Sequence, residues 1–339
     1  MILRRLRNWA VTLLPILVGL LLGLFLVAIA GSASGFSPSS VLQSLWEGAF
    51  GDQFAIAETL VRSIPVLMTG LGVAVCFRAG LWNIGAEGQL IIGGLSATAL
   101  LLQIPMPTGL ALLSGSLAGA VGGSLWALPA ALLKLRSGIN EVIVTLLLNF
   151  VAAGLLGFLV TGPLMEQEGS LPQTDPLPET ARWTLLLLPT RLHLGLFFAL
   201  LLALVLHFVM EKTVIGLDWK AYGASPESAK TLGIREDRVI WSAFLVGGAL
   251  AGIGGAMEVM GATYRLYEKW SPGYGYSGIV AALVARLNAA ALIPSSLLLG
   301  ALTAGGLGIQ RTLGLPPTLT WVIQACLLLP ITLRLRPKG

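Results

Sequence analysis

Apolar stretches of about 20 residues recur along almost the whole chain and constrain its fold more than any other feature. A helix that crosses a bilayer needs ~20 mostly apolar residues, and lipid leaves backbone groups no partner outside the chain, so helices satisfy them internally. Of 339 residues, 55% are hydrophobic and 11% charged, against about 25% charged in soluble domains. The sequence therefore predicts an all-α, polytopic membrane helical bundle without a separate soluble domain.

The pattern predicts about ten transmembrane helices within one transmembrane domain, residues 1–339. They lie at roughly 10–30, 58–77, 84–103, 108–133, 139–161, 191–210, 239–261, 276–290, 294–309 and 318–334. The eighth and ninth are short, so they either span or are broken or re-entrant. The first resembles a signal peptide, but its apolar run exceeds the usual 7–15 residues, and we expect it to be retained as a span.

Basic residues indicate the orientation of the chain, because Lys and Arg concentrate on the cytoplasmic side. With the N-terminus inside, 15 Lys and Arg fall inside and 5 outside. We therefore expect cytoplasmic N- and C-termini, a cytoplasmic segment at 211–238, and external loops at 31–57 and 162–190. Each external loop is either a docking place for an external partner or a solvated connector.

The 211–238 segment is the most polar part of the chain, with five basic and five acidic residues between apolar segments. It is longer than a turn between two spans requires. Its composition fits short helices broken by Gly216, Gly223, Pro226 and Gly233. We interpret it as a docking element on the inner face, where a soluble partner pushes on the membrane part.

A first polar cluster lies at residues 80–89, where Asn83, Glu87 and Gln89 stand among three glycines. Ionisable groups at membrane depth cost about 2.5–3.5 kcal/mol on insertion scales, and therefore face a cavity or a partner. Two interpretations remain open. The cluster lines a polar pathway, at an unwound helix start, or Glu87 pairs with Arg78 or Arg62 and fixes helix packing.

A second cluster, Asn140, Glu141, Thr145 and Asn149, follows one helical stripe. Glu141 falls in the first helical turn, where an acid also favours the helix dipole, so a capping role stays open for it. Thr145 and Asn149 lie deeper and favour a cavity or an interhelical hydrogen bond. A third region, 247–258, repeats small residues at intervals of three and four, which predicts a close-packing helix face.

Motifs for chemistry are missing from the sequence. It contains no Walker-type phosphate loop, no Ser, His and Asp in a triad-like arrangement, and no metal-ligand spacing. Cys76 and Cys326 sit singly in apolar segments as packing residues, and His193 and His207 are assigned no role. We expect no catalytic residue, no metal and no cofactor in this chain, which is therefore not expected to be an enzyme.

Four stretches resemble the permease subunits of bacterial ABC importers, in the branched-chain amino acid and ribose permease superfamily and its simple-sugar and nucleoside branch. These stretches are GLWNIGAEGQ at 80–89, NEVIVTLLLNF at 140–150, KAYGASPESAKTLGI at 220–234 and GALAGIGGAMEVMG at 248–261. The resemblance runs from about residue 58 to 334, and NIGAEGQ is its most specific element.

The resemblance implies a bacterial cytoplasmic membrane protein that translocates a nucleoside or simple sugar. It implies three partners: an ABC ATPase with two nucleotide-binding halves that binds ATP and Mg, a second and shorter permease, and a substrate-binding lipoprotein or periplasmic protein. The two polar clusters supply the expected substrate pathway: Asn83, Glu87, Gln89, Asn140, Glu141, Thr145 and Asn149. The resemblance maps the family's coupling helix onto residues 220–234, with ATPase coupling expected at Lys220, Gly223, Ala224, Ser225, Pro226 and Gly233.

Two departures from the family pattern bear on the substrate. Trp82 stands where the family usually has Phe, and residues 285–290 lack the usual Pro after Asn288. Two rival classes are an ion-coupled secondary transporter of a small polar solute, in which Glu87 carries protons, and a membrane scaffold without transport. The energy source of uptake separates the first rival, and flux after a change at Glu87 or Asn83 separates the second.

Overall fold

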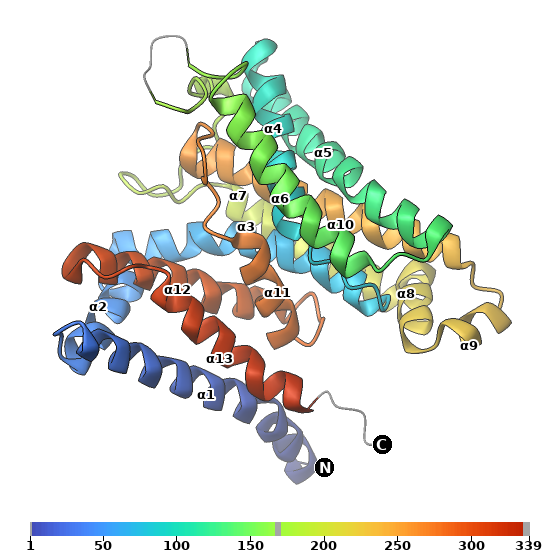
Figure 1. Ribbon diagram of the computed structural model, residues 1–339, viewed down its shortest axis with the longest axis horizontal. Helices are drawn as coiled ribbons and strands as arrows, with labels where there is room; N and C mark the ends of the chain where they lie inside the picture. Colours follow the sequence, from blue (N-terminus) through green and yellow to red (C-terminus); the bar gives the residue numbers. More distant parts are fainter. Residues whose placement is uncertain (1, 167–170, 335–339) are drawn as a thin grey trace. The chain divides into compact units, whose positions relative to one another are not determined.

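Helices make up nearly all of the regular structure (Figure 1). The computed structural model describes residues 2–166 and 171–334, and within these ranges it has two isolated β-bridges but no strand. The α-helices are α1 (Ile2–Ala33), α2 (Pro38–Phe50), α3 (Gln53–Arg78), α4 (Ala86–Gln103), α5 (Thr108–Ser137), α6 (Glu141–Val160), α7 (Gly195–Lys212), α8 (Val214–Ala224), α9 (Pro226–Thr231), α10 (Glu236–Glu258), α11 (Tyr274–Val284), α12 (Leu292–Leu313) and α13 (Leu319–Arg334). Two short turns join them: a 3-10 turn, η1 (Glu179–Ala181), and a π-helical turn, η2 (Val259–Thr263). The prediction of an all-α membrane bundle is confirmed.

All ten expected spans fall on helices. Among the described residues, seven helices are long and apolar enough to cross a membrane, namely α1, α3, α5, α6, α7, α10 and α12. The other three expected spans correspond to α4, α11 and α13. With 11 residues, α11 is about 16 Å long, roughly half of a bilayer core. The eighth expected span is therefore short, whereas the ninth, α12, has 22 residues.

The chain forms two compact units, one of residues 1–63 with 297–339 and one of residues 64–296. In the first unit, α1 packs along α13 and against α2. Glycines bring α1 close to α13: a Cβ at Gly23 would lie 2.6 Å from the Cα of Ile323. The backbone of Cys326 lies against Gly19 in the same contact, which agrees with a packing role for Cys326.

The expected loop at 31–57 contains a helix that the sequence analysis missed. Ser37 caps α2 by accepting a hydrogen bond from the Ser40 N–H at 3.1 Å, and Pro38 occupies its first position, where proline is tolerated. Gly48 of α2 packs on Gly308 of α12, with only 2.6 Å between an added Cβ and the Gly308 Cα. This part of the segment is thus packed structure within its unit.

The core of the second unit is formed by α4, α5 and α10, which pack on one another through glycines. Figure 1 shows α4, α5, α6 and α10 running side by side. A Cβ at Gly252 of α10 would lie 2.1 Å from the carbonyl oxygen of Gly119 in α5, and one at Gly93 of α4 would lie 2.2 Å from the Gly252 Cα. The prediction that 247–258 is a close-packing face is confirmed.

The segment at 162–190, of which residues 167–170 lie outside the described part, is packed on the residues that follow η2. Glu166 forms a 3.1 Å ion pair with Arg265. The Thr174 N–H donates to the Leu266 carbonyl at 2.8 Å, and the Leu177 N–H donates to the Tyr264 carbonyl at 2.7 Å. Except for η1, this segment has no helix among its described residues, but backbone hydrogen bonds fix its course.

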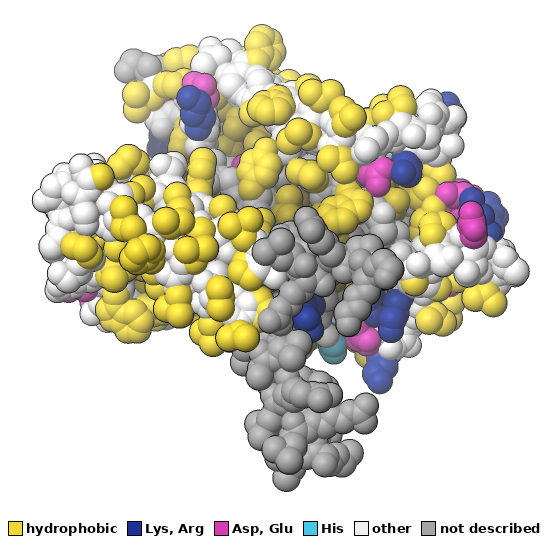
Figure 2. Space-filling view, turned by 60° about the horizontal axis from the view of Figure 1, so that its bottom comes forward, with side chains coloured by type: hydrophobic (Ala, Val, Ile, Leu, Met, Phe, Trp, Pro, Cys, Tyr) yellow, Lys and Arg dark blue, Asp and Glu magenta, His cyan; other side chains and the backbone are white. Residues whose placement is uncertain are grey.

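The polar segment at 211–238 contains two short helices, α8 and α9, as its composition predicted. The expected breaks at Gly216 and Gly223 are wrong, because both glycines lie inside α8. A Cβ at Gly216 would come within 2.4 Å of the Met210 carbonyl oxygen. Pro226 begins α9, and Gly233, with a φ of +82°, follows its end. Figure 2 shows charged side chains gathered toward the side of the view where α8 and α9 lie.

Candidate functional site

The chain is not helical between α3 and α4. α3 ends in a Schellman motif: the Leu81 N–H donates to the Cys76 carbonyl at 2.9 Å, and Gly80 takes a φ of +72°, a conformation that favours glycine at this position. Residues 81–84 then run without helical structure until α4 begins at Ala86. This stretch, residues 81–85, is called the break below. It holds the most specific part of the sequence pattern.

Asn83 and Gln89 bind each other across the start of α4. The Asn83 Nδ2 donates to Gln89 Oε1 at 3.1 Å, and the Gln89 Nε2 donates to Asn83 Oδ1 at 3.2 Å. The Asn83 Oδ1 also accepts from the Gly85 N–H at 2.9 Å. Both side chains are 1% exposed, so the break folds onto α4 through a buried amide pair.

Asn149 of α6 holds the break to α4 through both ends of its amide. Its Nδ2 donates to the Ile84 carbonyl at 2.9 Å, and its Oδ1 accepts from the Gly88 N–H at 2.8 Å. One turn earlier on α6, the Thr145 hydroxyl accepts from the Ile84 N–H at 3.2 Å. A buried backbone group left without its partner costs about 1–3 kcal/mol. Because the break lacks helical hydrogen bonds, these side chains stabilise it by binding its backbone groups.

Glu141 connects the break to the end of α5. Its Oε1 accepts from the Trp82 N–H at 3.2 Å, and its Oε2 lies 2.8 Å from the Lys134 Nζ. The capping role considered for Glu141 belongs to its neighbour Asn140, whose side chain accepts from the Val142 N–H at 2.8 Å. Asn140 is exposed and is the one predicted pathway residue that lies outside the buried cluster.

Glu87 joins α4 to the start of α11. Its Oε2 accepts from the Gly275 N–H at 2.6 Å, and the carboxylate is buried, with the residue 7% exposed. Arg78, one of the two partners considered for Glu87, pairs with Glu211 at 2.6 Å instead. A second buried acid, Glu258 of α10, accepts from the Tyr274 hydroxyl at 3.1 Å, one residue before Gly275.

Six of the seven predicted pathway residues are therefore buried together around the break, and their polar atoms bind protein groups. The sequence analysis missed three of their partners. Gly275 binds Glu87, and the Tyr276 hydroxyl lies 3.3 Å from Asn149 Nδ2. In both pairs the two residues are more than 120 positions apart in the sequence. Lys134 was counted only for topology. No local spacing in the sequence carries a signal for such distant pairs.

The predicted coupling residues lie where α8 meets α9, and Gly223 touches the end of α3. A Cβ at Gly223 would lie 2.2 Å from the Arg78 carbonyl oxygen and 2.9 Å from the Gly80 N. Ser225 caps α9 by accepting from the Ser228 N–H at 3.2 Å. Gly223 therefore rests on the turn that leads into the break, with no room for a side chain between them.

Hydrogen bonds also fix the same two helices to α10. The Trp219 Nε1 donates to the Ser242 hydroxyl at 2.9 Å, and Lys230 pairs with Glu236 at 2.6 Å. The Tyr222 hydroxyl donates to Glu236 at 2.5 Å. Burial and this bond raise the pKa of Tyr222 far above its ordinary value, so the hydroxyl remains a donor. Lys220, Gly223, Ala224 and Gly233 stay exposed.

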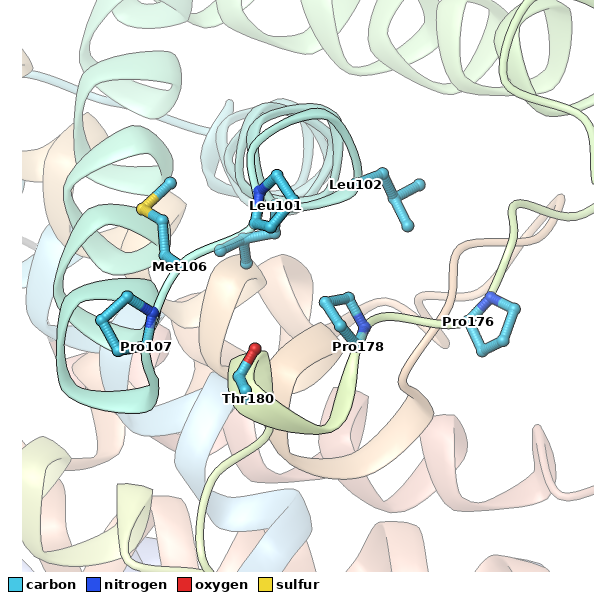
Figure 3. Close-up of a pocket in the computed structure, with 8 residues that line it drawn as sticks. Leu101, Leu102, Met106, Pro107, Pro176, Pro178 and Thr180 are labelled. Carbon is cyan, nitrogen blue, oxygen red and sulfur yellow. The ribbon is translucent and has the colours of Figure 1, made fainter.

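An apolar pocket lies apart from the break, at the other end of α4 (Figure 3). It has a volume of about 480 Å³ and is lined by Leu101, Leu102, Pro105, Met106, Pro107, Pro176, Pro178 and Thr180. Its lining comes from the end of α4, the connection to α5, the segment before η1 and η1 itself. Among the described residues, no three His, Cys, Asp or Glu side chains are grouped so as to hold a metal ion.

Known proteins first define the class: the chain resembles permease proteins of ABC transporters. It is 34% identical to a glucose ABC transporter permease protein of Haloferax volcanii, over 82% of this chain and 76% of that protein. It is 31% identical to a guanosine ABC transporter permease protein of Bacillus subtilis, over 96% of this chain and 93% of that protein. A nucleoside ABC transporter permease protein of Lactococcus lactis is 28% identical, over 97% and 92%.

A family model defines the chain more narrowly than this class does. Residues 55–332 match the permease component of the branched-chain amino acid transport system, and the chain belongs to this family. It is therefore a multi-pass membrane permease, as the resemblance of its motifs indicated.

Proposed function

We propose that this chain is the translocating permease subunit of an ATP-driven ABC importer that carries a nucleoside or simple sugar across the bacterial cytoplasmic membrane. The observation that carries the substrate class is the match over 96% of the chain to a protein named for guanosine transport. The 34% identity to a protein named for glucose supports the wider class of hydroxylated, uncharged solutes.

The neutral amides and hydroxyls around the break support the same class of solute. Asn83, Gln89, Thr145 and Asn149 supply hydrogen-bond donors and acceptors without net charge, which suits sugar hydroxyls and base edges. In this proposal they form the wall of the pathway together with Glu87 and Glu141, and Asn140 stands at its rim.

The proposed partners follow from the family description, since a permease component belongs to a transport system. We expect an ATPase with two nucleotide-binding halves, which holds ATP and Mg and performs hydrolysis, so that this chain is not itself an enzyme. A second, shorter permease and a substrate-binding lipoprotein or periplasmic protein complete the importer. The ATPase acts on the coupling residues from Lys220 to Gly233, and the bias of basic residues supports a cytoplasmic position for them.

Uptake by vesicles that contain the complete importer tests the proposal. Radiolabelled guanosine and glucose are offered outside, with ATP or a non-hydrolysable analogue enclosed. We expect uptake of at least one of them with ATP and none with the analogue. Uptake that survives ATP depletion and stops with an ionophore would instead show an ion-coupled transporter and contradict the proposal.

A further inference from the structure

The side chain of Asn149 occupies the place of a backbone hydrogen bond at the start of α4. The Ile84 carbonyl and the Gly88 N–H are four residues apart, which is the spacing of an α-helical hydrogen bond. Both bind the Asn149 amide instead, and the first bond of α4 runs from the Gln89 N–H to the Gly85 carbonyl at 3.0 Å. The amide is thus inserted into the first turn of the helix.

We propose that Asn149 is a positioning residue that holds the start of α4 unwound, and that displacement of the coupling segment, residues 220–233, winds this turn during transport. This inference rests on the proposed function, because it assumes that an ATPase moves the segment that contains Gly223. It assigns Asn149 a mechanical role in addition to any contact with solute.

Winding gives a backbone partner to each of the two groups that the Asn149 amide binds. Once the Asn149 amide withdraws, the Ile84 carbonyl can accept directly from the Gly88 N–H. Gly85 already has a φ of −83° and a ψ of 7°, close to the helical region, so the change falls mainly on residues 81–84. A residue advances the chain by up to about 3.3 Å when extended and by about 1.5 Å in a helix, so winding shortens those parts of the break that are extended.

The contact between Gly223 and the end of α3 makes this shortening respond to the coupling segment. Gly223 rests on the Arg78 carbonyl and the Gly80 N, at one end of the break. At the other end, α4 is fixed against α5 and α10, because Gly93 packs on the Gly252 backbone. A push on Gly80 therefore cannot shift the body of α4, and the five residues of the break must take it up.

Winding also changes which polar groups are available to a solute. Residues three or four apart share a helix face, whereas residues six apart do not. The reciprocal bonds between Asn83 and Gln89 therefore cannot persist once Asn83 joins the helix. Both amides are released together, as donors and acceptors of the kind that a nucleoside or sugar binds. The break thereby links a cytoplasmic displacement to the affinity of the pathway for its solute.

Hydrogen–deuterium exchange of residues 79–88 in the assembled importer tests the inference, with and without a non-hydrolysable ATP analogue. In the wild-type importer we expect the analogue to change exchange of this segment by about tenfold, the effect of a hydrogen-bond change near 1.4 kcal/mol. In Asn149→Leu, which has similar size but no amide, exchange should be the same in both states. Uptake should fall by about tenfold while ATP hydrolysis stays within about twofold.

Tyr276→Phe is the matched control, since it removes the third contact of the same amide and leaves both backbone bonds in place. Its exchange should respond to the nucleotide as that of the wild type does. Asn149→Asp keeps the acceptor for Gly88 but loses the donor to Ile84. Its uptake and its exchange response should therefore lie between those of the wild type and Asn149→Leu. It replaces Asn149→Leu if that variant does not assemble.

Three results would overturn the inference. The first is a wild-type segment whose exchange ignores the nucleotide. The second is a variant, Asn149→Leu or Asn149→Asp, with wild-type uptake and exchange. The third is loss of uptake in Asn149→Leu with the nucleotide response intact. The exchange measurement needs no solute, so the inference can fail while wild-type uptake still supports the proposed function.

Discussion

Gly80 and Gly35 both have a positive φ, +72° and +89°, but their surroundings differ. Nothing lies within 4 Å of a Cβ added at Gly35, whereas one at Gly80 would lie 3.1 Å from the Gly223 Cα. A left-handed backbone costs a non-glycine residue roughly 1–2 kcal/mol. Alanine at Gly35 therefore tests backbone strain alone, whereas alanine at Gly80 adds a contact with the coupling segment.

We predict that Gly80→Ala lowers uptake by about tenfold, because the added methyl group pushes on Gly223. Gly35→Ala should cost only its backbone strain, about 1–2 kcal/mol, and should retain most of the uptake per assembled complex. Uptake normalised to protein in proteoliposomes measures both. Equal loss in the two variants would show that strain alone explains Gly80.

We expect His193 to make the free energy of unfolding depend on pH. It lies before α7, is 1% exposed, and its Nδ1 accepts from the Gly195 N–H at 3.2 Å. Burial lowers its pKa to about 4, below its ordinary value of 6.5, so the unfolded state binds the proton more readily. Its contribution is complete above about pH 6.5 and is lost as the pH falls toward 4.

At pH 5 we therefore predict a loss of about 2 kcal/mol relative to pH 7 from this group. The thermal unfolding midpoint of the purified protein, measured from pH 7 to pH 5, checks it. His193→Gln keeps a polar side chain that does not titrate in this range, so its midpoint should depend less on pH. An equally steep dependence in that variant would assign the effect to another group.

At the scale of helices, the α5–α10 contact leaves no room for a side chain at Gly252. Gly252→Ala should destabilise by about 1–3 kcal/mol, the usual cost of overpacking, because its Cβ would lie 2.1 Å from the Gly119 carbonyl oxygen. Gly157→Ala in α6 is the control, since nothing lies within 4 Å of its Cβ. That variant should be neutral or slightly stabilising, because alanine favours helix. Thermal unfolding in detergent ranks the two, and a reversed order would contradict the packing argument.

Hydrophobic length predicted the helices well, because a span is a local property of about 20 residues. It failed where local signals are weak. α2 has 13 residues with Ser, Gln and Glu among them, too short and polar to read as a span. The break was anticipated only as one interpretation of the glycines at 80–88. Its partners on α6 and α11 depend on tertiary packing, so the sequence could nominate Asn149 and Glu87 but could not identify the groups that they bind.

At the scale of the whole molecule, the proposed orientation has two faces that chemistry can distinguish. Lys230 and Glu179 are exposed, on α9 and η1, and both native cysteines are buried. We predict that Lys230→Cys reacts with a membrane-impermeant maleimide only in inside-out vesicles, and that Glu179→Cys reacts only in intact cells. The reverse pattern would put α8 and α9 out of reach of a cytoplasmic ATPase.

The hydrogen bond between Glu87 and Gly275 constrains how α4 and α11 can move relative to each other. Gly275 is the second residue of α11, so the carboxylate rests on the positive pole of that helix. Sliding α11 along its own axis would break this hydrogen bond and leave two buried polar groups without their partner, at a cost of about 1–3 kcal/mol. The half-length α11 and the start of α4 are therefore linked, and we expect a displacement of one helix to move the other.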